Sequence, residues 1–242
     1  YKMIVQYDGT RYAGWQRQDK TENTIQGKIE SILSKMVGTA ITINGSGRTD
    51  AGVHAIGQVI NVKMNTPYAP KEIKEYMNTY LPEDIYIRKV HVVEERFHAR
   101  LTAKGKQYSY CIVNHRNPNV FRRKYTYHLP NKLDIATMEK AIPYFLGTKD
   151  FAAFTSKKNS KKSTIRTIHS IEILQVEDEV RLVFQGDGFL YHMIRILMGT
   201  FIEIGYGQKR VEEIEEIFQG RDRSKAGYLV PAKGLLLEEV FY

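Results

Sequence analysis

The fold and the chemistry of this chain both depend on residues 45–59, which read GSGRTDAGVHAIGQV. Glycines at positions 45, 47, 52 and 57 allow backbone torsions closed to other residues and let a second segment approach closely. Arg48 and Asp50 stand two residues apart within this segment. A tight turn in which Asp50 only caps its own backbone would explain an isolated Gly-Asp pair. Residues 45–59 are too long for that, so we expect a bend between two strands that presents both charged side chains.

The elements around the bend follow the order β-α-β-β-α-β. Apolar alternation predicts strands at residues 2–7, 40–44, 57–64 and 85–94. Helical spacing of apolar residues predicts helices over 25–36 and 70–80. This is the ferredoxin-like order.

The second half repeats this order with longer connections. Strands are predicted at residues 106–113, 124–128, 165–176, 180–185 and 235–241. Helices are predicted from residue 134 to the stop at Gly147, over 190–204, and around 211–218. We therefore expect an α+β protein of two ferredoxin-like domains, residues 1–100 and 101–242. Their sheets should be largely antiparallel and lie around a central basic cleft.

Composition narrows the function classes. The 242 residues carry 36 Lys and Arg against 27 Asp and Glu, a net charge of +9 that suits a phosphate-rich partner without proving one. One cysteine, Cys111, excludes an intrachain disulfide framework and fits a reducing compartment. No stretch approaches the ~20 apolar residues of a membrane span, and no signal-peptide pattern opens the chain. We expect a soluble, cytoplasmic protein with a short N-terminal piece preceding Tyr1.

Arg195 is unusual because it interrupts a helical segment, MIRILM at 193–198, that is otherwise apolar all round. Burying an unpaired charge costs several kcal/mol, so this guanidinium should meet a carboxylate, a phosphate or water. A side chain that reaches the surface remains an alternative. The nearest acid on the helix, Glu203, lies two turns away on another face, and Asp50 is the more attractive partner.

Tyr108 lies in the predicted strand GKQYSYC at 105–111, on the same face as Tyr110. Two core aromatic residues are the simpler interpretation.

Several of these segments resemble the TruA family of tRNA pseudouridine synthases. The resemblance is most specific at residues 45–59, and further matching segments include KQYSY at 106–110 and FLYHMIR at 189–195, with coverage of about the full length. It implies that Asp50 is the catalytic nucleophile and that Arg195 pairs with it across the two domains. It also implies that Tyr108 packs against the target uracil, and that Arg48 helps expel and replace the flipped nucleotide. A base pulled from its stack needs an aromatic surface, and tyrosine adds a hydroxyl that can relay a proton.

The family reaction breaks the N1–C1′ bond of a uridine in RNA, turns the uracil, and rejoins it through C5. Substrate and product are isomers, so we expect no cofactor, energy source or metal. The resemblance implies that Asp50 forms a covalent adduct, either at uracil C6 or at ribose C1′. The resemblance implies tRNA as the partner, uridines 38, 39 and 40 of the anticodon stem-loop as targets, and a homodimer.

Four lysines lie in a polar segment that could grip phosphates, although a solvated loop explains them equally well. They are Lys157, Lys158, Lys161 and Lys162. Asp50 and His54 are four residues apart, but Gly52 argues against the helix that would align them for a metal ion.

Two other functions fit part of the pattern. A non-catalytic RNA-binding or RNA-folding module would share the charge and the fold, but it has no need for Asp50 beside Arg48. A metal-dependent nuclease needs two or three clustered acids, and residues 45–59 supply only Asp50.

Overall fold

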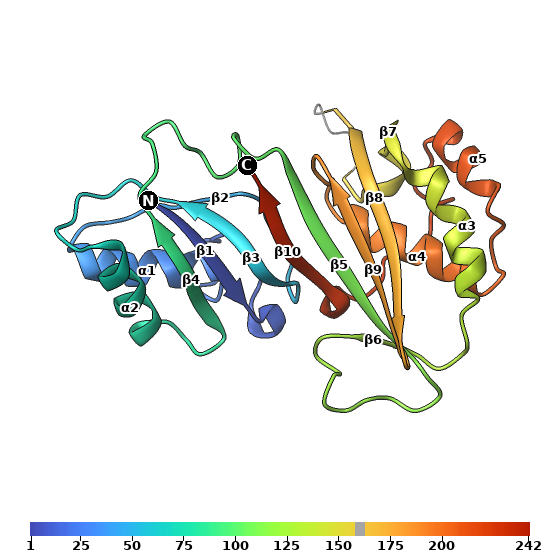
Figure 1. The fold of residues 1–242 in the computed structure, drawn as a ribbon, viewed down its shortest axis with the longest axis horizontal. Helices are drawn as coiled ribbons and strands as arrows, with labels where there is room; N and C mark the ends of the chain where they lie inside the picture. The colour runs from blue at the N-terminus through green and yellow to red at the C-terminus, as the bar shows by residue number, and fades with distance from the viewer. Residues whose placement is uncertain (158–162) are drawn as a thin grey trace. The chain divides into compact units, whose positions relative to one another are not determined.

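The computed structural model describes residues 1–157 and 163–242, and its contacts divide the chain into two compact units. Unit 1 comprises residues 1–104 and 236–242, and unit 2 comprises residues 105–235. Each unit carries helices and a mostly antiparallel set of strands, which confirms the predicted α+β class (Figure 1). Residues 236–242 of the last strand, expected in the second domain, fall in unit 1. The predicted basic cleft stays a prediction.

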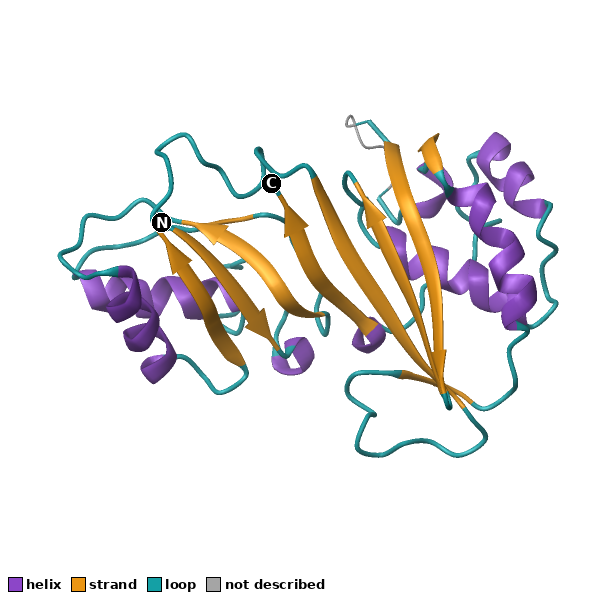
Figure 2. Cartoon of the chain, in the orientation of Figure 1, coloured by secondary structure: helices purple, strands orange, loops and turns teal. Residues whose placement is uncertain are grey.

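Unit 1 has the strand order β4-β1-β3-β10 with two helices against the strands (Figure 2). The elements are β1 (Lys2–Tyr7), α1 (Ile25–Val37), β3 (His54–Asn61), α2 (Pro70–Tyr80), β4 (Ile85–His91) and β10 (Leu235–Phe241). β1 pairs antiparallel with both β3 and β4. Its alternate residues Met3, Val5 and Tyr7 are buried, as period-2 alternation of a half-buried strand requires.

The two edges of β3 are used differently. β1 runs along one edge, so β2 (Asn44–Gly45) and β10 must share the other, β2 antiparallel near Asn61 and β10 parallel near His54. The strand predicted over 40–44 is only two residues long. Side chains of α1 replace its ladder, because Ser34 Oγ and Glu30 Oε1 accept the backbone N–H groups of Ile41 and Ile43 at 2.9 and 3.0 Å.

Unit 2 has the strand order β5-β9-β8-β7, all antiparallel, with the short β6 parallel to β5. Its elements are β5 (Gly105–Asn114), β6 (Tyr127–Leu129), α3 (Ile135–Phe145), β7 (Gly147–Asp150), β8 (Ile165–Val176), β9 (Glu179–Gly186), α4 (Met193–Gly205) and α5 (Glu213–Gly220). Strand β7 was not predicted. It starts at Gly147, whose φ of +85° ends the helical segment and turns the chain directly into a ladder with β8.

Helix α4 is the centre of the unit 2 core. Every residue of α4 except Arg195 and Glu203 is buried, which confirms the burial predicted from its all-round apolar sequence. Phe201 of α4 packs against Phe184 of β9, with ring centroids 6.2 Å apart. Phe145 of α3 packs on the same ring at 5.1 Å, so α3 and α4 form one layer against the sheet.

Gly57 allows β10 to approach β3 closely. A Cβ atom at this position would stand 2.0 Å from the carbonyl oxygen of Glu238, so Gly57→Ala should force the two strands apart. We expect unfolding in urea at a lower midpoint, equivalent to about 1–3 kcal/mol of lost stability. The control is Gly220→Ala at the end of α5, where a Cβ meets nothing within 4 Å and the midpoint should stay unchanged or rise. An unchanged midpoint for Gly57→Ala would contradict the close approach.

Candidate functional site

The segment between β2 and β3 is the bend that the sequence predicts. The N–H of Val53 donates to the carbonyl oxygen of Asp50 at 3.1 Å, and Gly52 has a φ of +79°. These two features define a turn that begins at Asp50 and requires a left-handed residue at its third position. In the same segment Arg48 is exposed and Asp50 is half-buried, whereas Thr49 between them is buried. Thr49 is therefore the buried residue of the three, and Arg48 and Asp50 on either side of it keep contact with solvent.

A second segment, Gly14-Trp15, supports the bend from outside the sheet. The N–H of Trp15 donates to the carbonyl oxygen of Thr49 at 3.0 Å. A Cβ at Gly14, whose φ is +100°, would lie 2.9 Å from that same carbonyl oxygen. The Trp15 ring is 2% exposed and fills the space beside Gly45, where a Cβ would meet the indole at 2.8 Å. Glycine is therefore required at both positions by close packing.

His54, the first residue of β3, is also tied to the N-terminal segment. Its Nδ1 accepts the N–H of Gly9 at 3.1 Å and lies 3.2 Å from Oδ1 of Asp8. The side chain of His54 is buried. His54 thus anchors the turn after β1 to the end of the bend. Among the described residues, no group of three or more His, Cys, Asp and Glu side chains could hold a metal ion.

Tyr108 and Phe189, from two separate sequence segments, meet in unit 2. Their ring centroids lie 5.4 Å apart at an interplanar angle of 88°, an edge-to-face contact. Tyr108 is 8% exposed on β5, opposite Phe184 of β9. This packing agrees with a core aromatic residue, and it also leaves the ring backed by a second aromatic group at the start of the segment that leads into α4.

Arg195 projects from the first turn of α4 and is half-buried. Its Nε donates to the carbonyl oxygen of Val230 at 2.8 Å, which gives one N–H of the guanidinium a backbone partner. The predicted ion pair between Arg195 and Asp50 stays a prediction.

The predicted basic loop is described only at one of its four lysines. Lys157 is exposed, and its backbone N–H donates to Thr155 Oγ1 at 3.3 Å. Lys158, Lys161 and Lys162 lie outside the described residues. Their contact with RNA therefore stays a prediction.

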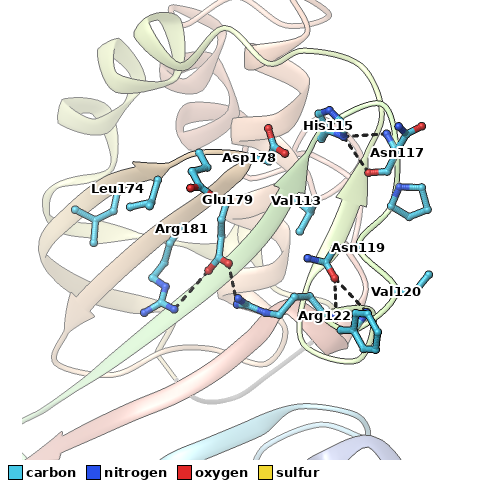
Figure 3. Close-up of a pocket in the computed structure, with 14 residues that line it drawn as sticks. Val113, His115, Asn117, Asn119, Val120, Arg122, Leu174, Asp178, Glu179 and Arg181 are labelled. Atoms are coloured by element: carbon cyan, nitrogen blue, oxygen red, sulfur yellow. Dashed lines mark hydrogen bonds and ion pairs between the residues drawn. The ribbon is translucent and has the colours of Figure 1, made fainter.

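A hollow of about 770 Å³ lies at the other end of the unit 2 strands and contains none of the predicted site residues (Figure 3). It is lined by the end of β5, by the loop that follows it, and by the β8–β9 turn. Its basic side chains Arg122 and Arg181 both face Glu179, at 2.8 and 3.6 Å. Because one carboxylate already neutralises part of this charge, the hollow is a poor phosphate site.

Sequence reasoning missed the residues beneath the bend. Tyr7 ends a predicted strand and Gln58 lies within residues 45–59, but neither was given a role of its own, and both side chains are buried. Burial raises the pKa of Tyr7 to about 12, although hydrogen bonds to Thr49 and Gln58 act in the opposite direction. A polar residue at an inward position of a strand is the signal that could have identified them.

Comparison with known proteins gives a consistent family. A family model described as tRNA pseudouridine synthase matches residues 3–101 and 141–242. A tRNA pseudouridine synthase A of Bacillus sp. (strain KSM-64) is 51% identical over 242 residues, covering 100% of this chain and 99% of the relative. The tRNA pseudouridine synthase A of Acetivibrio thermocellus is 44% identical over 241 residues, covering 100% of this chain and 98% of the relative.

A tRNA pseudouridine synthase A 2 of Bacillus cereus (strain ZK / E33L) is 44% identical over 240 residues, covering 99% of this chain and 98% of the relative. A chain of a solved Cbf5-Nop10-Gar1 complex covers 84% of this chain and is itself covered to 45%, with a TM-score of 0.39 and 12% identity, too distant to bear on the fold. None of the described helices is long and apolar enough to cross a membrane. The family match and the full-length relatives show that the chain belongs to the tRNA pseudouridine synthases, a family of isomerases.

Proposed function

We propose that this chain converts uridines 38, 39 and 40 of the tRNA anticodon stem-loop to pseudouridine, with Asp50 as the nucleophile. The observation that carries the proposal is the position of Asp50. It is the only acid in residues 45–59, it begins the turn that the N–H of Val53 closes, and it is half-buried next to the buried Thr49. A carboxylate nucleophile needs a fixed position and an ionised state.

The reaction sequence balances without another reactant. The carboxylate of Asp50 adds to C6 of the uracil or to C1′ of the ribose, and the N1–C1′ bond breaks. After the uracil turns, a C5–C1′ bond forms, the C5 proton leaves, N1 gains a proton, and the bond to Asp50 breaks. Substrate and product have the same composition, so no net oxidation occurs.

The other site residues support Asp50. Tyr108 offers the flipped base an aromatic face that is backed by Phe189. Arg195, already held at Nε by Val230, is the proposed counter-charge of Asp50. Arg48 is exposed next to the nucleophile and assists the exchange of the flipped nucleotide. Lys157, Lys158, Lys161 and Lys162 contribute phosphate contacts.

The net charge of +9 supports a tRNA partner, and we propose a homodimer as the acting form. A cytoplasmic location stays a prediction.

The proposal is tested with an unmodified tRNA transcript carrying tritium at uracil C5. Isomerisation releases the label to water, whereas binding alone retains it and a nuclease shortens the strand. Release without added metal is the expected result. Bound, intact and fully labelled tRNA would contradict the proposal.

Asp50→Asn keeps the shape of the side chain and removes its charge. We expect the variant to fold and to bind tRNA in a filter assay with wild-type affinity, while tritium release is abolished, because an amide is not a nucleophile here. Turnover near the wild-type rate by a sequence-verified Asp50→Asn protein would exclude Asp50 as the nucleophile.

Two substitutions of Tyr108 distinguish stacking on the base from proton transfer. Tyr108→Phe keeps the ring against Phe189 and loses only the hydroxyl, whereas Tyr108→Leu loses both. If the hydroxyl relays a proton, kcat of the phenylalanine variant should fall by about 10²-fold or more with tRNA affinity unchanged. The leucine variant should in addition bind more weakly. Full activity of Tyr108→Phe would leave the ring with a packing role only.

Arg195→Met tests the proposed ion pair by comparison with Arg195→Lys. Loss of the positive charge should lower kcat by about 10²-fold, because the carboxylate of Asp50 then loses the group that holds it in place for attack. Arg195→Lys keeps a positive charge at this position and should retain more activity than Arg195→Met. Wild-type kcat in Arg195→Met would show that Arg195 is not the counter-charge.

A further inference from the structure

Four polar side chains are buried where the bend meets the core of unit 1. Tyr7 is 4% exposed, Gln58 0%, Ser46 1% and Thr49 7%. Burying polar groups costs free energy unless each is hydrogen-bonded, and apolar residues of the same size would fill this space at lower cost. The hydrogen-bond partners of these buried polar side chains therefore indicate their role.

Gln58 on β3 binds the start of the bend at two points. Its Oε1 accepts the hydroxyl of Ser46 at 2.7 Å, and its Nε2 donates to the carbonyl oxygen of Gly47 at 3.0 Å. The side-chain amide thus bonds to a donor on Ser46 and to an acceptor on Gly47. Because these residues are consecutive, the two bonds fix the path of the backbone immediately before Arg48.

Tyr7 on β1 binds the centre of the bend. Its hydroxyl and Thr49 Oγ1 lie 2.8 Å apart and form a buried hydrogen bond. The backbone carbonyl of Thr49 is held independently by the N–H of Trp15 at 3.0 Å. Thr49 is therefore fixed through its side chain and its backbone, and its two chain neighbours are Arg48 and Asp50.

Both supports stand on paired strands. Val5, two residues before Tyr7, lies opposite Gln58 in the ladder between β1 and β3. The supporting side chains thus come from regular strands, which hold a group more precisely than a loop does. Tyr7 and Gln58 bond to each other, and Gln58 also accepts the N–H of Val59; their other described side-chain hydrogen bonds all end on residues 46–49.

We propose that Tyr7 and Gln58 are positioning residues of the reaction: together they fix residues 46–49, and through them the attack geometry of Asp50. This inference rests on the proposed role of Asp50 as the nucleophile. Displacing a reacting group by about 1 Å can cost on the order of 10²-fold in rate, so the loss of one such bond should act on kcat more than on binding.

The Tyr7–Thr49 bond can be removed from either side. We expect Tyr7→Phe and Thr49→Val each to lower kcat by about 10-fold or more while KM stays within about threefold. Thr49→Ser, which keeps a hydroxyl, should restore most of kcat. The double variant Tyr7→Phe/Thr49→Val should be no slower than the single variants, because both remove the same bond.

A matched control separates positioning from stability. Tyr12→Phe removes another tyrosine hydroxyl in unit 1, whose described hydrogen bond runs to Asp84 Oδ1 at 2.5 Å and so ends outside residues 45–59. It should shift the thermal midpoint about as much as Tyr7→Phe and leave kcat unchanged. Ser46→Ala, a milder change than any replacement of Gln58, should lower kcat through the other support.

Two results would overturn the inference: kcat within twofold of wild type in Tyr7→Phe and Thr49→Val, or equal losses in Thr49→Ser and Thr49→Val. An unchanged kcat in Ser46→Ala would show that Gln58 is not a positioning residue. Failure of the proposed function is distinguishable, because then the wild type releases no tritium or Asp50→Asn stays active. Amide hydrogen exchange at Trp15, whose N–H bonds to Thr49, should be faster in Tyr7→Phe than in Tyr12→Phe and does not depend on activity.

Discussion

Thr49 is the residue on which the geometry of the candidate site depends. Its hydroxyl is hydrogen-bonded to Tyr7 of β1, and its carbonyl oxygen accepts the N–H of Trp15. Both partners come from the N-terminal segment, far from Thr49 in the sequence. Arg48 and Asp50 are its covalent neighbours, and the peptide bonds between them are planar and stiff. Fixing Thr49 therefore limits where both charged side chains can go. Tyr7, Trp15 and Thr49 are all buried, so water does not compete for these two hydrogen bonds.

The same constraint explains the glycines of the region. Gly14 and Gly45 leave room for the Thr49 carbonyl and the Trp15 ring, and Gly57 leaves room for β10 at the edge of β3. Gly52 instead supplies a backbone torsion, with its φ of +79°. Close approach and left-handed torsion are different requirements, and this short stretch of chain uses glycine for both.

Unit 2 contributes a different kind of surface. Its helix α4 is buried except at two charged positions, and one of them, Arg195, lies in the first turn with its Nε already held by Val230. Tyr108 is backed edge-to-face by Phe189, which precedes the same helix. A buried apolar helix is a suitable base for the guanidinium of Arg195, because the surrounding packing limits the rotamers available to this side chain. The hollow near Glu179 differs, since its arginines pair with that acid.

Local pattern alone determined a large part of this protein. Period-2 alternation gave β1, and the all-round apolar segment near Arg195 gave the buried helix α4, because both signals arise from neighbours in sequence. The glycine-rich segment around Asp50 identified the bend and, by resemblance, the family that the comparisons show. Only the tertiary structure decided that the segment at 40–44 is capped by Ser34 and Glu30 rather than paired as a long strand, and that β10 joins unit 1. It also decided that Tyr7 and Gln58 support the bend. The Tyr7–Thr49 and Gln58–Gly47 hydrogen bonds join residues 42 and 11 positions apart, and such bonds produce no periodic pattern in the sequence. Their partners come together only once the strands have paired.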